Sequence, residues 1–220
     1  MAVLLNIETT TTNCSVSLSK EGETLVLKED YNTKFSHAES LHVFIDEVVK
    51  LAKIKLSKID AIAVSKGPGS YTGLRIGVSA AKGLCFALDK PLISVSTLES
   101  LSRQVKIDKG FIVPMLDARR MEIYSAVFNA KHHQIRETQA QILDENSFLD
   151  YLKKDKNYFI GNGVDKSKSI IQHKNAIFIQ NKLPSAREMG KLAFEKFQKN
   201  DFEDVAYFEP FYLKDFINLG

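Results

Sequence analysis

The sequence lacks the features that mark secreted, membrane-bound or disulfide-stabilised proteins. It contains no tryptophan and only two cysteines, Cys14 and Cys85, among 220 residues. Two cysteines this far apart predict buried, reduced thiols rather than a disulfide framework. No apolar run approaches the ~18 residues that a membrane span requires, and the N-terminus has no basic leader or cleavage site. We therefore expect a cytoplasmic protein that does not associate with a membrane.

An excess of charge of one sign is also absent. The 30 basic and 27 acidic residues leave a formal net charge of +3. Dedicated RNA-binding proteins concentrate basic residues in a patch or stripe, whereas the densest basic run here, at 153–156, is interrupted by an acid. The composition permits contact with RNA without predicting it. Its 44% hydrophobic and 26% charged residues are typical of a globular chain.

What the chain does contain is one order of predicted elements, repeated in each half: three strands, then helix, strand, helix, strand, helix. In the first half, the strands fall at 2–7, 14–19, 24–28, 61–65 and 92–95, and the helices at about 36–52, 74–88 and 96–105. In the second half, the strands fall at 111–116, 122–129, 134–139, 158–160 and 176–179, and the helices at about 144–152, after 161–163, and at 185–197. Capping boxes open three helices: Ser36 with Glu39, Ser96 with Glu99, and Ser185 with Glu188.

Three sequential strands followed by alternating helices and strands predict a mixed sheet with helices on its faces. Two such units in tandem describe an α/β protein of two ribonuclease-H-like subdomains, the duplicated architecture of actin, sugar kinases and chaperone ATPases. We place these subdomains at residues 1–106 and 107–220. A likeness of fold does not by itself assign an activity.

An acidic residue ends the first strand of each half, Glu8 in one and Asp117 in the other. In enzymes of this architecture, an acid at this point usually holds a metal ion or the attacking water beside a nucleotide phosphate. Such an acid is usually followed by glycine, whose N–H can approach the phosphate closely. Thr9 and Ala118 follow here, so we interpret both acids as remnants of a site. The alternative is an active phosphate site.

A glycine-rich loop, residues 67–73, joins the predicted strand at 61–65 to the helix at 74–88. Its backbone N–H groups and the helix dipole could attract a phosphate, although no Gly-Lys-Ser or Gly-Lys-Thr completes a Walker A loop. Equally, the glycines could let the strand and the helix pack closely. The residues alone do not decide between these two interpretations.

The helix at 74–88 is apolar on two sides. One stripe comprises Leu74, Val78, Ala81, Cys85 and Leu88, and the other Ile76, Ala80, Leu84 and Ala87. Gly73, Gly77 and Ala81 form a smooth strip, and close packing must offset the roughly 0.5–1 kcal/mol that each interior glycine costs a helix. The helix's own sheet covers only one face. Another helix of the chain or a second protein must cover the rest, and intramolecular cover is the default.

Metal ligands and nucleophiles are not arranged in any recognised motif. His37 and His42 are five residues apart and lie on different faces of a helix, and the His-Glu-x-x-His and Gly-x-Ser-x-Gly motifs are absent. We therefore expect no metal site and no catalytic residue in this chain.

The stretch from 67 to 77, continued through 80–84, closely resembles the signature of the TsaB (YeaZ) family. The resemblance extends to 91–99, to 117–124 and to the two ends, 7–10 and 210–214, and is weak in the rest of the second half. The matching signature-loop residues are Gly67, Pro68, Gly69, Ser70, Thr72 and Arg75.

The resemblance implies a duplicated actin-like fold and a non-catalytic, scaffolding role in forming threonylcarbamoyladenosine on tRNA. It implies a heterodimer with the catalytic subunit TsaD through helices of the first half. The ATPase TsaE joins that pair, and tRNA is reached through the complex. ATP and the metal ion are expected on TsaD, which holds its ion with a His-x-x-x-His pair. His37 and His42 of this chain do not match that spacing.

We expect the partner surface on the helix at 74–88, and two copies of the chain to pair through it when the partner is absent. The residues expected to form it are Gly73, Leu74, Ile76, Gly77, Ala80, Ala81 and Leu84. Two other functions compete with this interpretation. One is a small ATP-dependent phosphotransferase of the actin-like superfamily that uses Glu8 and Asp117. The other is a metallopeptidase, for which the sequence offers no protease constellation.

Overall fold

The protein, described by a computed structural model over residues 1–31 and 37–214, folds as two units. The first unit comprises residues 1–97 and 184–211, and the second comprises 98–183 with the C-terminal residues from 212. Each unit contains one five-stranded sheet. The predicted order of elements is confirmed in both halves of the chain.

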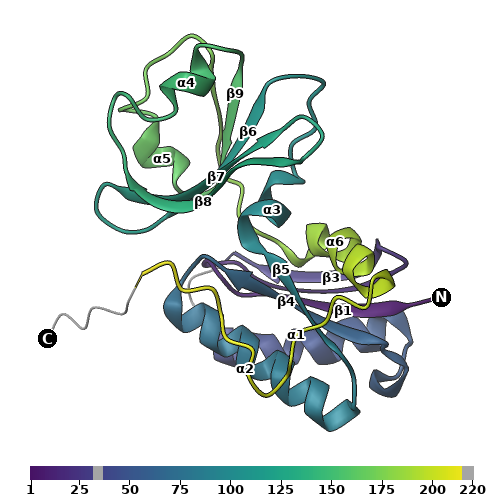
Figure 1. The fold of residues 1–220 in the computed structure, drawn as a ribbon. Coiled ribbons are helices and arrows are strands. Elements are labelled where there is room, and N and C mark those ends of the chain that lie inside the picture. The colour runs from purple at the N-terminus through teal and green to yellow at the C-terminus, as the bar shows by residue number, and fades with distance from the viewer. Residues whose placement is uncertain (32–36, 215–220) are drawn as a thin grey trace, which may run out of the picture. The chain divides into compact units, whose positions relative to one another are not determined.

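The sheet of the first unit has the strand order β3-β2-β1-β4-β5. Its strands are β1 (Val3–Glu8), β2 (Cys14–Lys20), β3 (Glu23–Asp30), β4 (Ala61–Gly67) and β5 (Leu92–Ser96). β1, β2 and β3 form an antiparallel meander, whereas β4 and β5 run parallel to β1. The helices α1 (His37–Ala52) and α2 (Tyr71–Leu88) cover one face, and α6 (Ala186–Gln198) covers the other (Figure 1).

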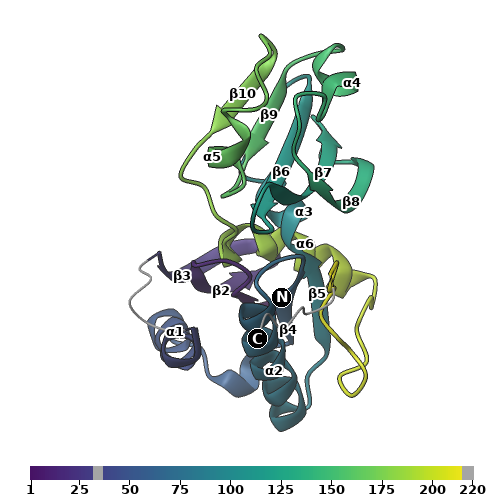
Figure 2. The ribbon, with the colours of Figure 1, turned by 90° about the vertical axis from the view of Figure 1, so that its left-hand side faces the viewer.

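The sheet of the second unit repeats this pattern with the order β10-β9-β6-β7-β8. Its strands are β6 (Phe111–Asp117), β7 (Glu122–Asn129), β8 (Gln134–Ile142), β9 (Asn157–Ile160) and β10 (Ala176–Ile179). The short helices α4 (Leu149–Leu152) and α5 (Val164–Ser167) pack on one face, where Phe148 and Phe159 meet edge to face. The residues of α3 (Thr97–Ser102) pack on the other face (Figure 2).

The boundary of the units differs from the predicted division at 106. The last helix of each half packs on the sheet of the other half: Leu98 and Leu101 of α3 join the core of the second unit, and Met189 and Leu192 of α6 join that of the first. Burying an apolar helix face on whichever sheet is within reach is what stabilises a helix. Element order along the chain therefore predicts the sheets but not which sheet each terminal helix covers.

Several local predictions can be checked directly. Ser185 caps α6 by accepting a hydrogen bond from the backbone N–H of Arg187, and Ser70 caps α2, which begins three residues earlier than predicted. The helix predicted from 144 begins only at Leu149, because Asp144 closes a turn through the N–H of Asn146. Ser36 lies outside the described residues.

The two cysteines are buried and unbonded, as predicted, and burial raises the pKa of each thiol to about 12. In the described part of the chain, no helix is both long and apolar enough to cross a membrane.

Candidate functional site

The glycine loop lies where the parallel strands of the first unit end. β1 ends at Glu8, β4 ends at Gly67, and α2 begins after Ser70. The Ser70 hydroxyl accepts a hydrogen bond from the N–H of Gly73, and the Ser70 N–H donates to the carbonyl of Thr10. The loop is thus fastened both to the helix that follows it and to the segment after β1.

Three glycines of the loop and helix lie directly against Thr9 and Thr10. A Cβ atom built on Gly69 would lie less than 3.0 Å from Thr10, and one built on Gly73 or Gly77 would lie equally close to Thr9. The Thr9 hydroxyl donates a hydrogen bond of 2.7 Å to the carbonyl of Gly73. The glycines are therefore required for close packing of the helix on this segment, the second of the two interpretations that the sequence left open.

Glu8 is fully buried beneath the same loop rather than exposed in it. Its Oε1 accepts hydrogen bonds from the Thr10 N–H at 2.7 Å and from the Thr10 hydroxyl at 2.5 Å. Burial raises the pKa of the Glu8 carboxyl, and hydrogen bonds, including those from Thr10, oppose the shift only in part. The geometry makes Glu8 a group that holds the chain after β1 in place.

Asp117, the corresponding acid of the second unit, is exposed and has a different set of partners. Its Oδ1 accepts hydrogen bonds from the Arg119 N–H at 2.6 Å and from Lys166 Nζ at 2.7 Å. The Asn162 side chain accepts from the Asp117 N–H at 3.0 Å. No sequence signal could have pointed to Lys166, which is 49 residues away.

The predicted partner surface needs correction at four of its seven residues. Gly73, Leu74, Gly77 and Ala81 are buried inside the first unit, where Gly73 and Gly77 contact Thr9 and Ala81 joins the core. They form the inner face of α2 and are not available to a second protein. The strip is covered within the chain, by the segment after β1 rather than by another helix or a second protein.

The other three predicted residues, Ile76, Ala80 and Leu84, are half-buried and pack against the core of the first unit. The outer face of α2 is the side that carries Gly83 and Phe86: Phe86 is 86% exposed, and a Cβ built on Gly83 would meet no atom within 4 Å. Neither Gly83 nor Phe86 is among the residues predicted from the sequence, although Gly83 lies within the matching stretch and Phe86 two residues beyond it.

The residues of the signature loop also divide into a buried group and an exposed group. Gly67 and Pro68 are buried, Gly69 is half-buried, and the side chains of Ser70, Thr72 and Arg75 are exposed.

The C-terminal segment packs on this region of the first unit. Glu203 pairs with Leu92 at the edge of β5, and Lys82 on α2 donates hydrogen bonds to the carbonyls of Ala206 and Phe208. The N–H of Phe211 donates to the carbonyl of Lys66 at 2.8 Å. The segment therefore runs along α2 and ends at the glycine loop (Figure 1).

The histidines of α1 are not brought together with other metal-ligand side chains in the described residues. His37 Nε2 lies 2.6 Å from the carbonyl oxygen of Thr11, and His42 is exposed. Across residues 1–31 and 37–214, no three His, Cys, Asp or Glu side chains form a group that could hold a metal ion.

The chain is similar to proteins that form threonylcarbamoyladenosine on tRNA. A family model described as TsaD, the tRNA N6-adenosine threonylcarbamoyltransferase, matches residues 32–217. The tRNA threonylcarbamoyladenosine biosynthesis protein TsaB of Haemophilus influenzae is 30% identical, with 96% of this chain and 93% of that protein aligned. A tRNA N6-adenosine threonylcarbamoyltransferase of Staphylococcus epidermidis is 40% identical, but over only 42% of this chain and 32% of its own length.

A crystal structure from Pseudomonas aeruginosa, described as similar to the peptidase YEAZ, superimposes with a TM-score of 0.86 at 25% identity. It covers 97% of this chain and 100% of its own. The likeness therefore extends over both units.

Proposed function

Because the chain belongs to the TsaB (YeaZ) family, we propose that it is a non-catalytic subunit of the machinery that forms threonylcarbamoyladenosine on tRNA. In this proposal it binds and supports a TsaD-type transferase. The observation that carries it is the near full-length match to TsaB relatives, combined with a first unit whose phosphate-site positions serve internal packing.

Three features support a role without catalysis. Thr9 and Thr10 lie against the loop glycines, and the N–H groups of Ser70 and Gly73 are hydrogen-bonded within the chain. Glu8 is buried and bonded to Thr10, and Asp117 is paired with Lys166. The competing phosphotransferase would need both acids free to act on a nucleotide or its metal ion.

The outer faces of α1 and α2 support partner binding. Val43 and Leu51 on α1 are 54% and 58% exposed, and Phe86 on α2 is 86% exposed. A side-chain-free position at Gly83 lets another backbone approach this helix closely. Large apolar side chains on adjacent helices of a folded unit favour an interface, which also serves a homodimer when the partner is absent. TsaE and tRNA would join through this complex.

The test is reconstitution. The pure chain, given tRNA, threonine, bicarbonate and ATP, is expected to yield no modified nucleoside, whereas adding the TsaD-type partner and the other subunits restores product. Product formed by the chain alone would refute the non-catalytic assignment. A chain that neither binds the transferase nor raises its product yield would refute the supporting role.

A further inference from the structure

The turn between β6 and β7 places two arginines in an unusual backbone conformation. Arg119 and Arg120 have φ angles of +68° and +49°, a region that glycine and asparagine adopt readily and arginine does not. The turn is closed by hydrogen bonds from the Ala118 N–H to the Glu122 carbonyl and from the Glu122 N–H to the Arg119 carbonyl. Turn geometry alone would favour other residues at both positions.

One lysine, Lys166, donates three hydrogen bonds to the turn. Lys166, whose side chain is only 16% exposed, donates to Asp117 Oδ1 at 2.7 Å, to the Arg120 carbonyl at 2.9 Å and to the Glu122 carbonyl at 2.5 Å. Asp117 also accepts the hydrogen bond from the Arg119 N–H. The backbone that carries the two arginines is therefore fixed by side chains of its own unit.

The charge of the two arginines is not compensated by the acids beside them. Asp117 is paired with Lys166, and Glu122 is paired with Lys214. Within the ranges that the structure describes, neither the Arg119 nor the Arg120 guanidinium takes part in a hydrogen bond or ion pair, and both residues are exposed. Two exposed positive charges therefore extend from a turn whose backbone is fixed.

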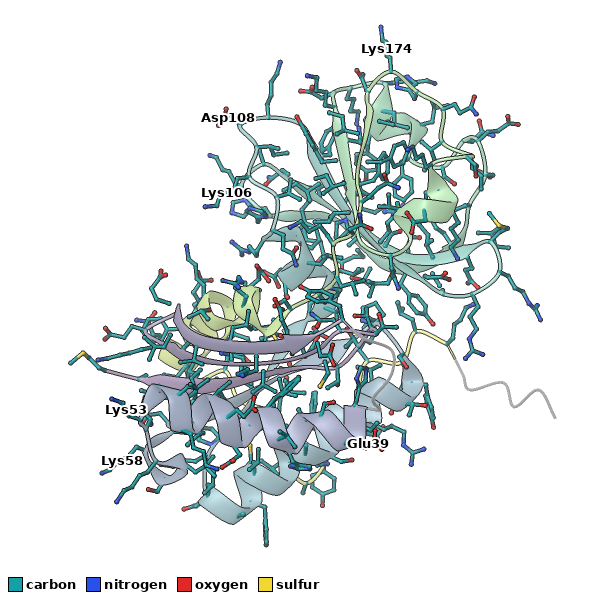
Figure 3. The ribbon with its side chains drawn as sticks, turned by 180° about the vertical axis from the view of Figure 1, so that it is seen from behind. Glu39, Lys53, Lys58, Lys106, Asp108 and Lys174 are labelled. Atoms are coloured by element: carbon teal, nitrogen blue, oxygen red, sulfur yellow. The ribbon has the colours of Figure 1, made fainter. Side chains whose placement is uncertain are left out.

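The second unit also carries the positive charge of the whole chain. Its segments, 98–183 and 212–220, contain 15 Lys and Arg against 11 Asp and Glu, a net charge of +4, whereas the first unit has 15 against 16, a net charge of −1. Several of its basic side chains, among them Lys106 and Lys174, extend outward from the unit (Figure 3). A polyanion that approaches the chain is attracted to the second unit.

We propose that the Arg119–Arg120 turn binds the phosphate backbone of RNA, and that this is where the chain itself contacts tRNA. Guanidinium groups bind phosphates through paired N–H donors, and those without an ion-pair partner need not break an ion pair to do so. The choice of RNA over another polyanion rests on the proposed function. The turn positions the RNA and takes no part in reading its sequence.

The test replaces the pair by residues that suit the backbone. Arg119→Asn combined with Arg120→Gly removes two charges while favouring the same turn, so the variant is expected to melt at or above the wild-type temperature. Binding of tRNA is titrated at several salt concentrations, both with the chain alone and with its TsaD-type partner. If each arginine neutralises one phosphate, the slope of log K against log salt falls by about 0.7–0.9 per residue. Extrapolated from 1 M salt, this corresponds to a roughly 25- to 60-fold weaker Kd at about 0.1 M.

The matched control is Lys106→Gln combined with Lys174→Gln, which removes the same charge from other exposed positions of the same unit. For this control variant, we expect the slope of log K against log salt to equal that of the wild type within experimental error. An unchanged slope in the arginine variant, or an equal loss in both variants, would overturn the proposal. The proposal would also be overturned if the arginine variant lost binding to anionic lipid vesicles but kept its binding to tRNA. Binding of the TsaD-type partner is measured on the same samples. An arginine variant that still binds the partner but no longer binds tRNA supports this inference. A wild-type chain that does not bind the transferase refutes the proposed function instead.

Discussion

Two glycines of one helix, Gly77 and Gly83, allow the internal and external roles of α2 to be separated. Gly83 faces open space, so Gly83→Gln adds a side chain without a clash and removes a poor helix former. Gly77 contacts Thr9, so Gly77→Ala forces the helix away from the segment after β1. The first substitution tests the outer face of the helix and the second tests its inner face.

The expected effects on stability have opposite signs. Replacing an interior helical glycine by a good helix former gains about 0.5–1 kcal/mol, or a rise in Tm of roughly 1–4 °C for a chain of this size. Overpacking at Gly77 costs about 1–3 kcal/mol and lowers the Tm accordingly. If the outer face binds the partner, the Gly83→Gln side chain prevents close approach. An overpacking cost of about 1–3 kcal/mol weakens the complex roughly 5- to 150-fold.

The assay measures Tm by thermal unfolding and affinity for the TsaD-type transferase by titration on the same preparations. Gly83→Gln is expected to be more stable but to bind more weakly, and Gly77→Ala to be less stable but to bind nearly normally while folded. A stabilised Gly83→Gln variant with wild-type affinity would refute the assignment of the outer face. Equal losses of affinity in both variants would show that the inner face also shapes the interface.

Three further predictions concern single side chains. Phe86→Ala should weaken partner binding by about 1–2 kcal/mol, read by the same titration, with an unchanged Tm, because Phe86 is 86% exposed in the free chain. Glu8→Gln should gain stability over the wild type as the pH rises. The folded chain favours protonated Glu8, so wild-type stability falls from the unfolded-state pKa, ordinarily 4.5, up through the raised folded-state pKa, and melting curves across this interval would show a widening difference. Asp117→Ala should leave product yield of the reconstituted reaction at saturating tRNA within about tenfold, and a loss of roughly 10² or more with partner binding and tRNA binding intact would restore a catalytic role.

The elements and their order could be predicted from the sequence because each is encoded locally. Alternating or continuous apolar runs mark the strands, and Ser70 and Ser185 cap helices through their own side chains. The partner of each terminal helix could not be predicted in this way. The apolar faces of α3 and α6 fit a sheet of either half, so their placement depends on the tertiary structure.

The sequence predicts where on α2 a close contact is made, but not which part of the protein makes it. The spacing of Gly73, Gly77 and Ala81 correctly marks a close contact, yet a smooth strip fits a segment of the same chain as well as a second helix. Both sides of this helix are apolar in the sequence, so only the structure separates them. Leu74 and Val78 beside the strip are buried, whereas Phe86 is exposed and Gly83 faces open space.

The two acids at equivalent points of the duplicated fold show why position alone does not assign a role. Glu8 is fully buried with its Oε1 bonded to Thr10, and burial raises its pKa, so the folded chain favours its neutral form. Asp117 is exposed and forms an ion pair with Lys166. The same topological position therefore holds a group that fastens a loop in one unit and a group that fastens a turn in the other. In both units the acid accepts a hydrogen bond from the backbone N–H two residues further on, Thr10 in one unit and Arg119 in the other, and so fixes the segment that follows the first strand.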